Sequence, residues 1–214
     1  MKKLISSLLI TCLSMIGVAQ AVGNAQSGEQ KSAACTACHG QGGKTPVLPN
    51  APKLAGQHAS YITEQLNAFK RSVDENFAKD NKGETRSDPT MAAMTLSLTP
   101  ESIADLAIYF ASQSVTHEAI TATERDNAQT LYRGGNQKTG VAACIACHGP
   151  HGTGNAAAKF PSISGQSVNY VTKALKDFRG NTRQSSHNGM MNGVAARMTD
   201  TEIDAIAKYV SALH

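Results

Sequence analysis

The motif Cys-x-x-Cys-His occurs twice in this chain of 214 residues, once near the N-terminus and once in the second half. Two thiols three positions apart lie on one helical turn and can add to the two vinyl groups of a haem, after which the adjacent imidazole can bind the iron. We therefore predict two covalently bound haem c groups. Their expected attachment residues are Cys35, Cys38, Cys144 and Cys147, and their expected iron ligands are His39 and His148.

Paired cysteines have two other uses in proteins, as a redox-active disulfide and as half of a zinc site. A zinc site made from two such pairs spaces them by about 15–20 residues, whereas these pairs lie more than 100 residues apart. A thioredoxin-like motif does not require the trailing histidine, which follows both pairs here. Both alternatives therefore fit the motifs less well than haem attachment.

The two motifs belong to an internal repeat, with an offset of 109 residues that later becomes 100. The repeat aligns several residues that follow each motif: Gly40 with Gly149, Pro52 with Pro161, Gly56-Gln57 with Gly165-Gln166, and Tyr61 with Tyr170. The change of offset leaves about nine additional residues in the first half, within the polar stretch 72–89, which we expect to be an exposed loop. The repeat predicts two tandem domains of one fold, residues 22–114 and 126–214, joined by a linker over 115–125.

Helical patterns fill both halves, and no segment has the pattern of a strand. We expect helices over 28–38, over 60–70 and from Thr99 onward, the last with a stripe of Ile103, Leu106, Ala107 and Phe110. A capping box over 199–202 begins the corresponding last helix, with a stripe of Ile203, Ile206, Ala207 and Val210. The fold class is therefore all-α, and the first and last helices of each half are expected to cross and cover one edge of the porphyrin.

Each haem iron needs an axial ligand opposite the histidine, and methionine there raises the reduction potential and suits electron transfer. The candidates are Met91, Met94, Met190, Met191 and Met198. Only Met91 and Met191 occupy matching positions in the repeat, so we predict these two as iron ligands.

His187, four residues before Met191, is the rival ligand in the second half. It has no partner in the repeat, and neither do four other histidines, namely His58, His117, His151 and His214. We expect all five to be surface or loop residues.

The first 21 residues have the features of a secretory signal peptide: two lysines, an apolar stretch over 4–18 and the cleavage site Ala19-Gln20-Ala21. Cys12 lies inside the apolar stretch, which disfavours lipid attachment, and is expected to leave with it. No other stretch approaches the roughly 20 apolar residues that span a bilayer. We expect a soluble protein of the periplasm, in agreement with haem c attachment outside the cytoplasm.

The number and placement of charged residues do not indicate a nucleic-acid partner. Removal of residues 1–21 lowers the formal net charge from +4 to +2, because Lys2 and Lys3 are lost with no acid. No basic stripe interleaved with aromatic residues occurs, so nucleic-acid binding is not expected.

These features resemble the cytochrome c4 family, two-haem electron carriers made of tandem class I cytochrome c domains. The resemblance covers nearly the whole exported sequence. Besides the haem motifs, it rests on the segments Pro52-Lys53-Leu54-Ala55-Gly56-Gln57, Leu131-Tyr132-Arg133-Gly134-Gly135 and Met191-Asn192-Gly193-Val194-Ala195-Ala196. It implies haems that face each other across the domain interface. It also implies that the carbonyls of Pro52 and Pro161 accept the ring N–H of His39 and His148.

The resemblance further implies periplasmic electron transfer near the inner membrane, with peripheral membrane association. The donor would be a quinol-oxidising complex or a dehydrogenase, and the acceptor a terminal oxidase. Two other functions are alternatives to a free carrier. A dihaem peroxidase needs an open haem position and acid–base residues, which the matched methionines and the short chain disfavour. A cytochrome subunit bound to a periplasmic dehydrogenase can have the same fold, and the sequence leaves it open.

Overall fold

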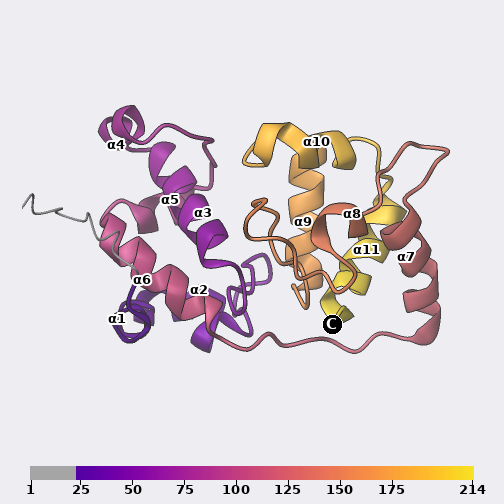
Figure 1. The fold of residues 1–214 in the computed structure, drawn as a ribbon, viewed down its shortest axis with the longest axis horizontal. Helices are drawn as coiled ribbons and strands as arrows, with labels where there is room; N and C mark the ends of the chain where they lie inside the picture. The colour runs from indigo at the N-terminus through magenta and orange to yellow at the C-terminus, as the bar shows by residue number, and fades with distance from the viewer. Residues whose placement is uncertain (1–22) are drawn as a thin grey trace, which may run out of the picture.

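The computed structural model describes residues 23–214. The expected signal peptide, with Cys12, and residue 22 lie outside the described residues. Two helical halves lie side by side, joined by a linker that runs along one edge of both (Figure 1). Within residues 23–214, the β-structure consists of two isolated bridges, Asn136 with Val141 and Asn155 with Phe160. The prediction of an all-α fold is confirmed.

The halves repeat the same order of helices. The first half contains α1 (Ala25–Lys31), α2 (Ala33–His39), the 3-10 turn η1 (Gln41–Gly43), α3 (Ala59–Arg71), α4 (Glu75–Asp80), α5 (Pro89–Thr95) and α6 (Pro100–Ala111). The second half contains α7 (Ala122–Gly134), α8 (Ile145–His148), α9 (Val168–Arg179), the 3-10 turn η2 (His187–Gly189), α10 (Met190–Ala195) and α11 (Asp200–Ala212). α4 is the one helix of the first half without a counterpart among the described residues.

Two local expectations were wrong. The stretch 72–89 is not a simple exposed loop, because the Asp74 side chain accepts the Phe77 N–H and caps α4. The helix expected over 28–38 is divided at Ser32 into α1 and α2. The Ser32 hydroxyl donates to the Glu29 carbonyl at 2.7 Å, a local bond that competes with a continuous helix.

The linker between the halves is shorter than expected. Thr121 and Glu124 form a capping box, and the helix α7 begins at Ala122. The last four residues of the stretch 115–125 therefore form the first turn of this helix. The linker contacts both halves: the Thr116 hydroxyl donates to the Lys44 carbonyl at 3.0 Å, and the Glu118 N–H donates to the Ser211 carbonyl at 2.9 Å.

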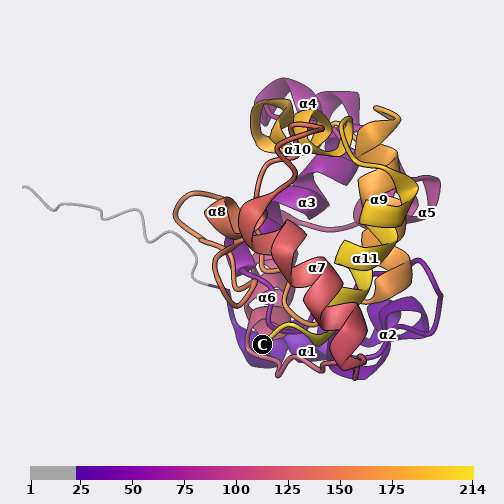
Figure 2. The same ribbon diagram turned by 90° about the vertical axis from the view of Figure 1, so that its right-hand side faces the viewer.

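Each half has its own apolar core, built on its last helix. Both predicted stripes are buried, Ile103, Leu106, Ala107 and Phe110 on α6 and Ile203, Ile206, Ala207 and Val210 on α11. The first helix of each half packs against the last, as Figure 2 shows for α7 and α11. The rings of Tyr132 on α7 and Tyr209 on α11 lie 5.2 Å apart. The predicted packing of first against last helix is thus confirmed.

Candidate haem-binding site

The two motifs lie at the ends of equivalent helices, α2 and α8. All four motif cysteines are half-buried, and none of them forms a disulfide within residues 23–214. Burial raises the pKa of Cys35 and raises the pKa of Cys144 to about 11. A redox-active dithiol needs the opposite shift, toward an exposed thiolate. The surroundings of the cysteines therefore do not favour thiol–disulfide chemistry.

The two motif histidines are buried and held in one orientation. His39 Nδ1 lies 2.8 Å from the Pro52 carbonyl oxygen, and His148 Nδ1 lies 2.9 Å from that of Pro161. A carbonyl only accepts, so each Nδ1 carries the proton and each Nε2 keeps its lone pair for a metal. Burial lowers the pKa of both imidazoles, and the hydrogen bond to the carbonyl opposes this effect without cancelling it. The lowered pKa favours the neutral imidazole, the form that can bind a metal. The contacts that the resemblance implied are confirmed.

A glycine ends each motif helix in a conformation that other residues avoid. Gly40 has φ 75° and ψ 168°, and Gly149 has φ 76° and ψ 170°. A Cβ on Gly40 would lie 1.9 Å from the Thr45 carbonyl oxygen. The chain can therefore turn away directly after His39 and His148, toward the prolines that orient them.

The predicted methionine ligands lie on equivalent short helices. Met91 is on α5, where the Asp88 side chain accepts its N–H at 3.0 Å, and Met191 is on α10, where its N–H donates to the Ser186 hydroxyl at 3.3 Å. Both side chains are half-buried. Among their rivals, Met94 and Met190 are exposed and Met198 is part of the core.

Basic residues that the sequence analysis missed hold the segments after these helices. The Lys70 ammonium on α3 donates to the Leu96 and Leu98 carbonyls, each at 2.8 Å. Arg179 on α9 donates to the Met198 carbonyl at 3.0 Å. Lys70 and Arg179 share the offset of 109, so the repeat contained a signal for them.

A second missed group is a pair of arginines between α3 and α9. Arg183 donates to the Tyr61 hydroxyl at 2.9 Å and to the Tyr170 hydroxyl at 3.1 Å, and Arg86 donates to Tyr170 at 3.3 Å. Arg183 is buried. Within the part of the chain that the structure describes, neither arginine forms a salt bridge with a carboxylate.

This arginine pair favours a negative charge. Burial alone would raise the pKa of Tyr170, but the guanidiniums of Arg183 and Arg86 outweigh it and lower the pKa to about 7. A buried cation needs a counter-charge, and the Tyr170 hydroxyl can supply it as a phenolate. The residues of the two motifs fit haem at two points: the thiol pairs and the oriented imidazoles.

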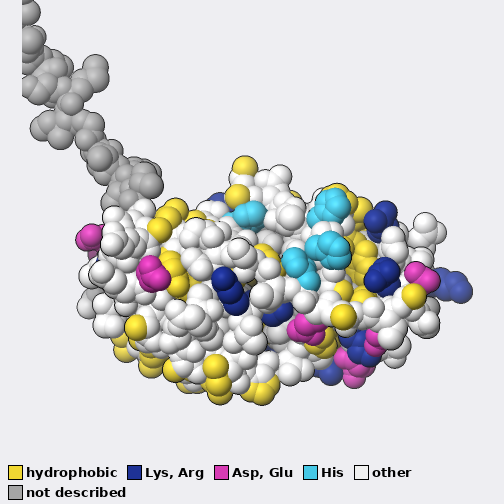
Figure 3. All heavy atoms as spheres, turned by 90° about the horizontal axis from the view of Figure 1, so that it is seen from below, with side chains coloured by type: hydrophobic (Ala, Val, Ile, Leu, Met, Phe, Trp, Pro, Cys, Tyr) yellow, Lys and Arg dark blue, Asp and Glu magenta, His cyan; other side chains and the backbone are white. Residues whose placement is uncertain are grey.

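The remaining histidines do not form a metal site. Four are exposed: His117, His151, His187 and His214. His58 lies in the loop that precedes α3, as expected; it is half-buried and its Nε2 is enclosed without a partner among the described residues. The rings of His117 and His214 lie 5.5 Å apart. Histidine side chains gather on the face of the molecule seen in Figure 3. Among residues 23–214, no group of three or more His, Cys, Asp or Glu side chains could hold a metal ion.

Comparisons with known proteins agree with this geometry. The cytochrome c family matches residues 25–114 and 127–214, one match in each half. The chain is 42% identical to cytochrome c4 of Thiocapsa roseopersicina over 194 residues, 90% of this chain and 94% of that protein. It is 29% identical to a thiosulfate dehydrogenase electron acceptor of Thiomonas intermedia, over 85% of this chain and 79% of that protein.

A solved structure extends the similarity to the arrangement of the two halves. Reduced recombinant cytochrome c4 from Pseudomonas stutzeri superimposes with a TM-score of 0.80 and 37% identity, over 90% of this chain and 100% of that chain. The chain therefore belongs to the cytochrome c4 family: it is a dihaem electron-transfer protein, not an enzyme, with a covalently bound haem c in each of its two cytochrome c domains.

Proposed function

We propose that the protein carries electrons in the periplasm from a respiratory donor, a quinol-oxidising complex or a dehydrogenase, to a terminal acceptor such as an oxidase. The observation that carries the proposal is the equivalence of the two sites. Each half presents a buried histidine with its Nε2 free and a half-buried methionine on a short helix. Two protein ligands on each iron leave no position for a substrate, which suits electron transfer.

Each residue has a specific role in this proposal. Cys35 and Cys38 hold one haem through thioether bonds, and Cys144 and Cys147 hold the other. His39 and His148 would bind the irons through Nε2, and Met91 and Met191 would be the second protein ligands. Bound haem supplies the one-electron chemistry, while the protein fixes its orientation, its ligands and its exposure to water.

The periplasmic location rests on the sequence of residues 1–21. Their basic, apolar and small-residue regions have the order of a signal peptide. Within residues 23–214, no helix is long and apolar enough to cross a membrane. Expression with and without residues 1–21, followed by haem staining of the periplasmic fraction, tests this location.

A second candidate role is that of a dedicated acceptor for a dehydrogenase. It is supported by the similarity to the Thiomonas protein, whose name describes an electron acceptor of thiosulfate dehydrogenase. The two roles differ in how long the partner stays bound. Affinity purification from solubilised membranes separates them, because a free carrier should elute alone at moderate salt, and a fixed subunit should elute with its dehydrogenase.

Visible spectroscopy during a potentiometric titration tests the main proposal. We expect two reversible one-electron steps and a Met–iron charge-transfer band that disappears on reduction. A haem that binds added peroxide or cyanide rapidly in the native protein would indicate an open axial position, and would contradict the carrier role.

A further inference from the structure

The two Gly-Gln segments of the repeat meet at the interface between the halves. The Gln166 Oε1 accepts the Lys53 N–H at 2.7 Å, and its Nε2 donates to the Lys53 carbonyl at 2.9 Å. In the opposite direction, the Gln57 Oε1 accepts the Ser162 N–H at 3.0 Å, and its Nε2 donates to the Ser162 carbonyl at 2.7 Å. Each glutamine thus binds the backbone of the other half, and the two contacts are equivalent.

The N–H groups that the glutamines bind belong to peptide groups that already contact the axial histidines. The Pro52 carbonyl and the Lys53 N–H are the two ends of one peptide group. Its oxygen accepts from His39 at 2.8 Å, and its nitrogen donates to Gln166. The Pro161–Ser162 peptide likewise accepts from His148 at 2.9 Å and donates to Gln57. A continuous chain of imidazole, peptide and glutamine therefore crosses the interface twice.

Hydrogen bonds in such a chain polarise one another. A peptide whose N–H donates has a more negative carbonyl oxygen, which accepts more strongly at its other end. A stronger bond from the imidazole N–H increases the electron donation of the ring to a bound metal. That donation stabilises the oxidised iron and lowers its reduction potential.

We propose that Gln57 and Gln166 are positioning residues that tune the axial histidine of the opposite half. Gln166, in the second half, acts on His39, and Gln57, in the first half, acts on His148. The inference rests on the proposed ligation of iron by these histidines. It makes the reduction potential of each haem depend on the docking of the other domain.

The structure holds both glutamines firmly. Each Oε1 also accepts the N–H of the following residue, His58 at 2.9 Å and Ser167 at 3.0 Å. The preceding glycines lie against Val115 of the linker, where a Cβ on Gly56 would come within 2.3 Å of Val115 and one on Gly165 within 2.6 Å. The two glutamines are therefore fixed by local backbone bonds and by a linker residue common to both.

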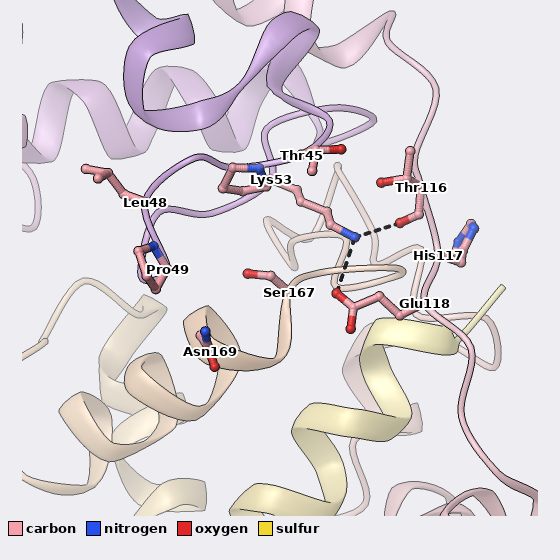
Figure 4. A pocket seen from close by; sticks show the side chains of 10 residues that line it. Thr45, Leu48, Pro49, Lys53, Thr116, His117, Glu118, Ser167 and Asn169 are labelled. Atoms are coloured by element: carbon pink, nitrogen blue, oxygen red, sulfur yellow. Dashed lines mark hydrogen bonds and ion pairs between the residues drawn. The ribbon is translucent and has the colours of Figure 1, made fainter.

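Lys53 fixes the same region from the other side. Its side chain is buried and crosses a cavity of about 370 Å³ at the interface, where its ammonium donates to the Thr116 carbonyl at 2.9 Å (Figure 4). Glu118 lies 3.8 Å from the same ammonium. The Pro52–Lys53 peptide is thus held in place by the hydrogen bonds of its own backbone groups and by the anchored side chain of Lys53.

The test uses the full dihaem protein with Gln57→Leu and Gln166→Leu, one at a time. Each potential is assigned by haem-specific NMR during a redox titration. Gln166→Leu should raise the potential of the haem at Cys35–His39 more than that of the other haem. Gln57→Leu should raise the potential of the haem at Cys144–His148. The N–H proton of the affected axial histidine in the reduced protein should move upfield, because its hydrogen bond weakens.

Controls separate tuning from interface stability. Thr116→Val removes the linker bond to Lys44 and touches neither peptide, so it should leave both histidine N–H signals in place. Gln57→Asn and Gln166→Asn keep an amide at the interface but shorten the side chain by one methylene, and they replace the leucine variants if those fold poorly. Each asparagine variant should likewise raise the potential of the haem in the opposite half. Shifts confined to the haem of the substituted half, equal shifts in both haems or unchanged potentials would overturn the proposal. Two His/Met haems in the unsubstituted protein would at the same time leave the carrier function intact.

Discussion

At the residue scale, the chain fixes both the protonation and the orientation of each motif histidine. Burial disfavours the imidazolium, and a proline carbonyl fixes the proton on Nδ1. The glycine that follows each histidine lets the chain turn back, so that this carbonyl comes within reach. A neutral imidazole whose Nδ1–H is held by a carbonyl presents Nε2 in a fixed direction, which is the usual role of outer hydrogen bonds at metal sites.

The predicted ligand role of Met91 and Met191 can be tested by single substitutions. Met91→Ala and Met191→Ala should each remove about half of the Met–iron charge-transfer absorbance and lower one reduction potential, because one of the two irons loses its thioether ligand. Visible spectra and potentiometry of the folded variants measure both effects.

The rival residues are the controls for this prediction. Met94→Ala and Met190→Ala should leave the absorbance unchanged. Loss of the band in either of them would show that the register of the repeat is wrong. A perturbed second haem in His187→Ala, with Met191→Ala silent, would identify a bis-histidine site.

The roles of residues that belong to a sequence motif could be predicted from the sequence. The roles of residues that depend on contacts with distant parts of the chain could not. The spacing of Cys35, Cys38 and His39 carries its own chemistry. By contrast, a lysine such as Lys70 is expected at the surface. It is buried here because its ammonium donates to two carbonyls in the segment that follows α5. Arg86 was missed for a similar reason, since it lies in a polar stretch and stacks over the Phe69 ring at 4.6 Å.

At the element scale, α1 packs closely against α6 in the first half. A Cβ on Gly28 of α1 would come within 2.1 Å of the Asp105 carbonyl oxygen. The Asp105 side chain accepts the Asn24 N–H at 2.6 Å and the Lys31 ammonium at 2.5 Å. One residue of α6 thus holds both ends of α1.

Gly28→Ala should destabilise the protein, by about 1–3 kcal/mol or more, because overpacking forces the two helices apart. The matched control is Gly134→Ala at the end of α7, where an added Cβ meets nothing within 4 Å. That substitution should be neutral or stabilising by less than about 1 kcal/mol. Urea unfolding of both variants measures the difference. Equal effects would show that α1 does not approach α6 this closely.

Asp105→Asn should lower the free energy of unfolding in a pH-dependent way. The Asn24 N–H and the Lys31 ammonium lower the pKa of Asp105 to about 2. Because the folded-state pKa lies below the ordinary value, the carboxylate stabilises the fold above about pH 4 and loses this effect as the pH falls toward 2. Urea unfolding at pH 7, 4 and 3 should show the gap between variant and native protein narrowing. A gap for Asp105→Asn that stays constant with pH would contradict the prediction.

The elements with strong local signals were predicted well. The capping residues Thr99 and Thr199 begin α6 and α11 as expected, and the buried stripes follow the helical period. The division at Ser32 and the short helix α4 were missed, because each depends on a single side-chain bond to the backbone. Such bonds leave little trace in the pattern of apolar residues.

At the scale of the whole molecule, the two halves are related by repeat and joined by equivalent contacts. The sequence alignment identified Gln57 with Gln166 as equivalent residues, but equivalence does not imply contact. Only the packing of the halves shows that each glutamine reaches the backbone beside the other histidine. An alignment offset contains no information on the relative placement of the domains, so the interface could not be derived from it.

The charge of each half predicts unequal reduction potentials. Residues 22–115 contain 8 Lys and Arg against 9 Asp and Glu, a net of −1, and residues 116–214 contain 10 against 7, a net of +3. A more positive surround disfavours the oxidised iron, so the haem of the second half should have the higher potential. The difference should be modest, because exposed charges are screened beyond about 10 Å at ordinary salt.

Redox titration with haem-specific NMR signals assigns the two potentials, and a higher potential at the haem of Cys35–His39 would refute the charge argument. Repetition at low and high salt is the control, because an electrostatic difference should shrink as the salt concentration rises.

The haem content of the chain tests the central claim most directly. Protein purified from the periplasmic fraction is extracted with acid acetone, denatured and assayed as its pyridine complex. If both Cys-x-x-Cys-His motifs carry thioether-bound haem, two haems per chain should remain after extraction. Recovery of one haem or none would contradict the account.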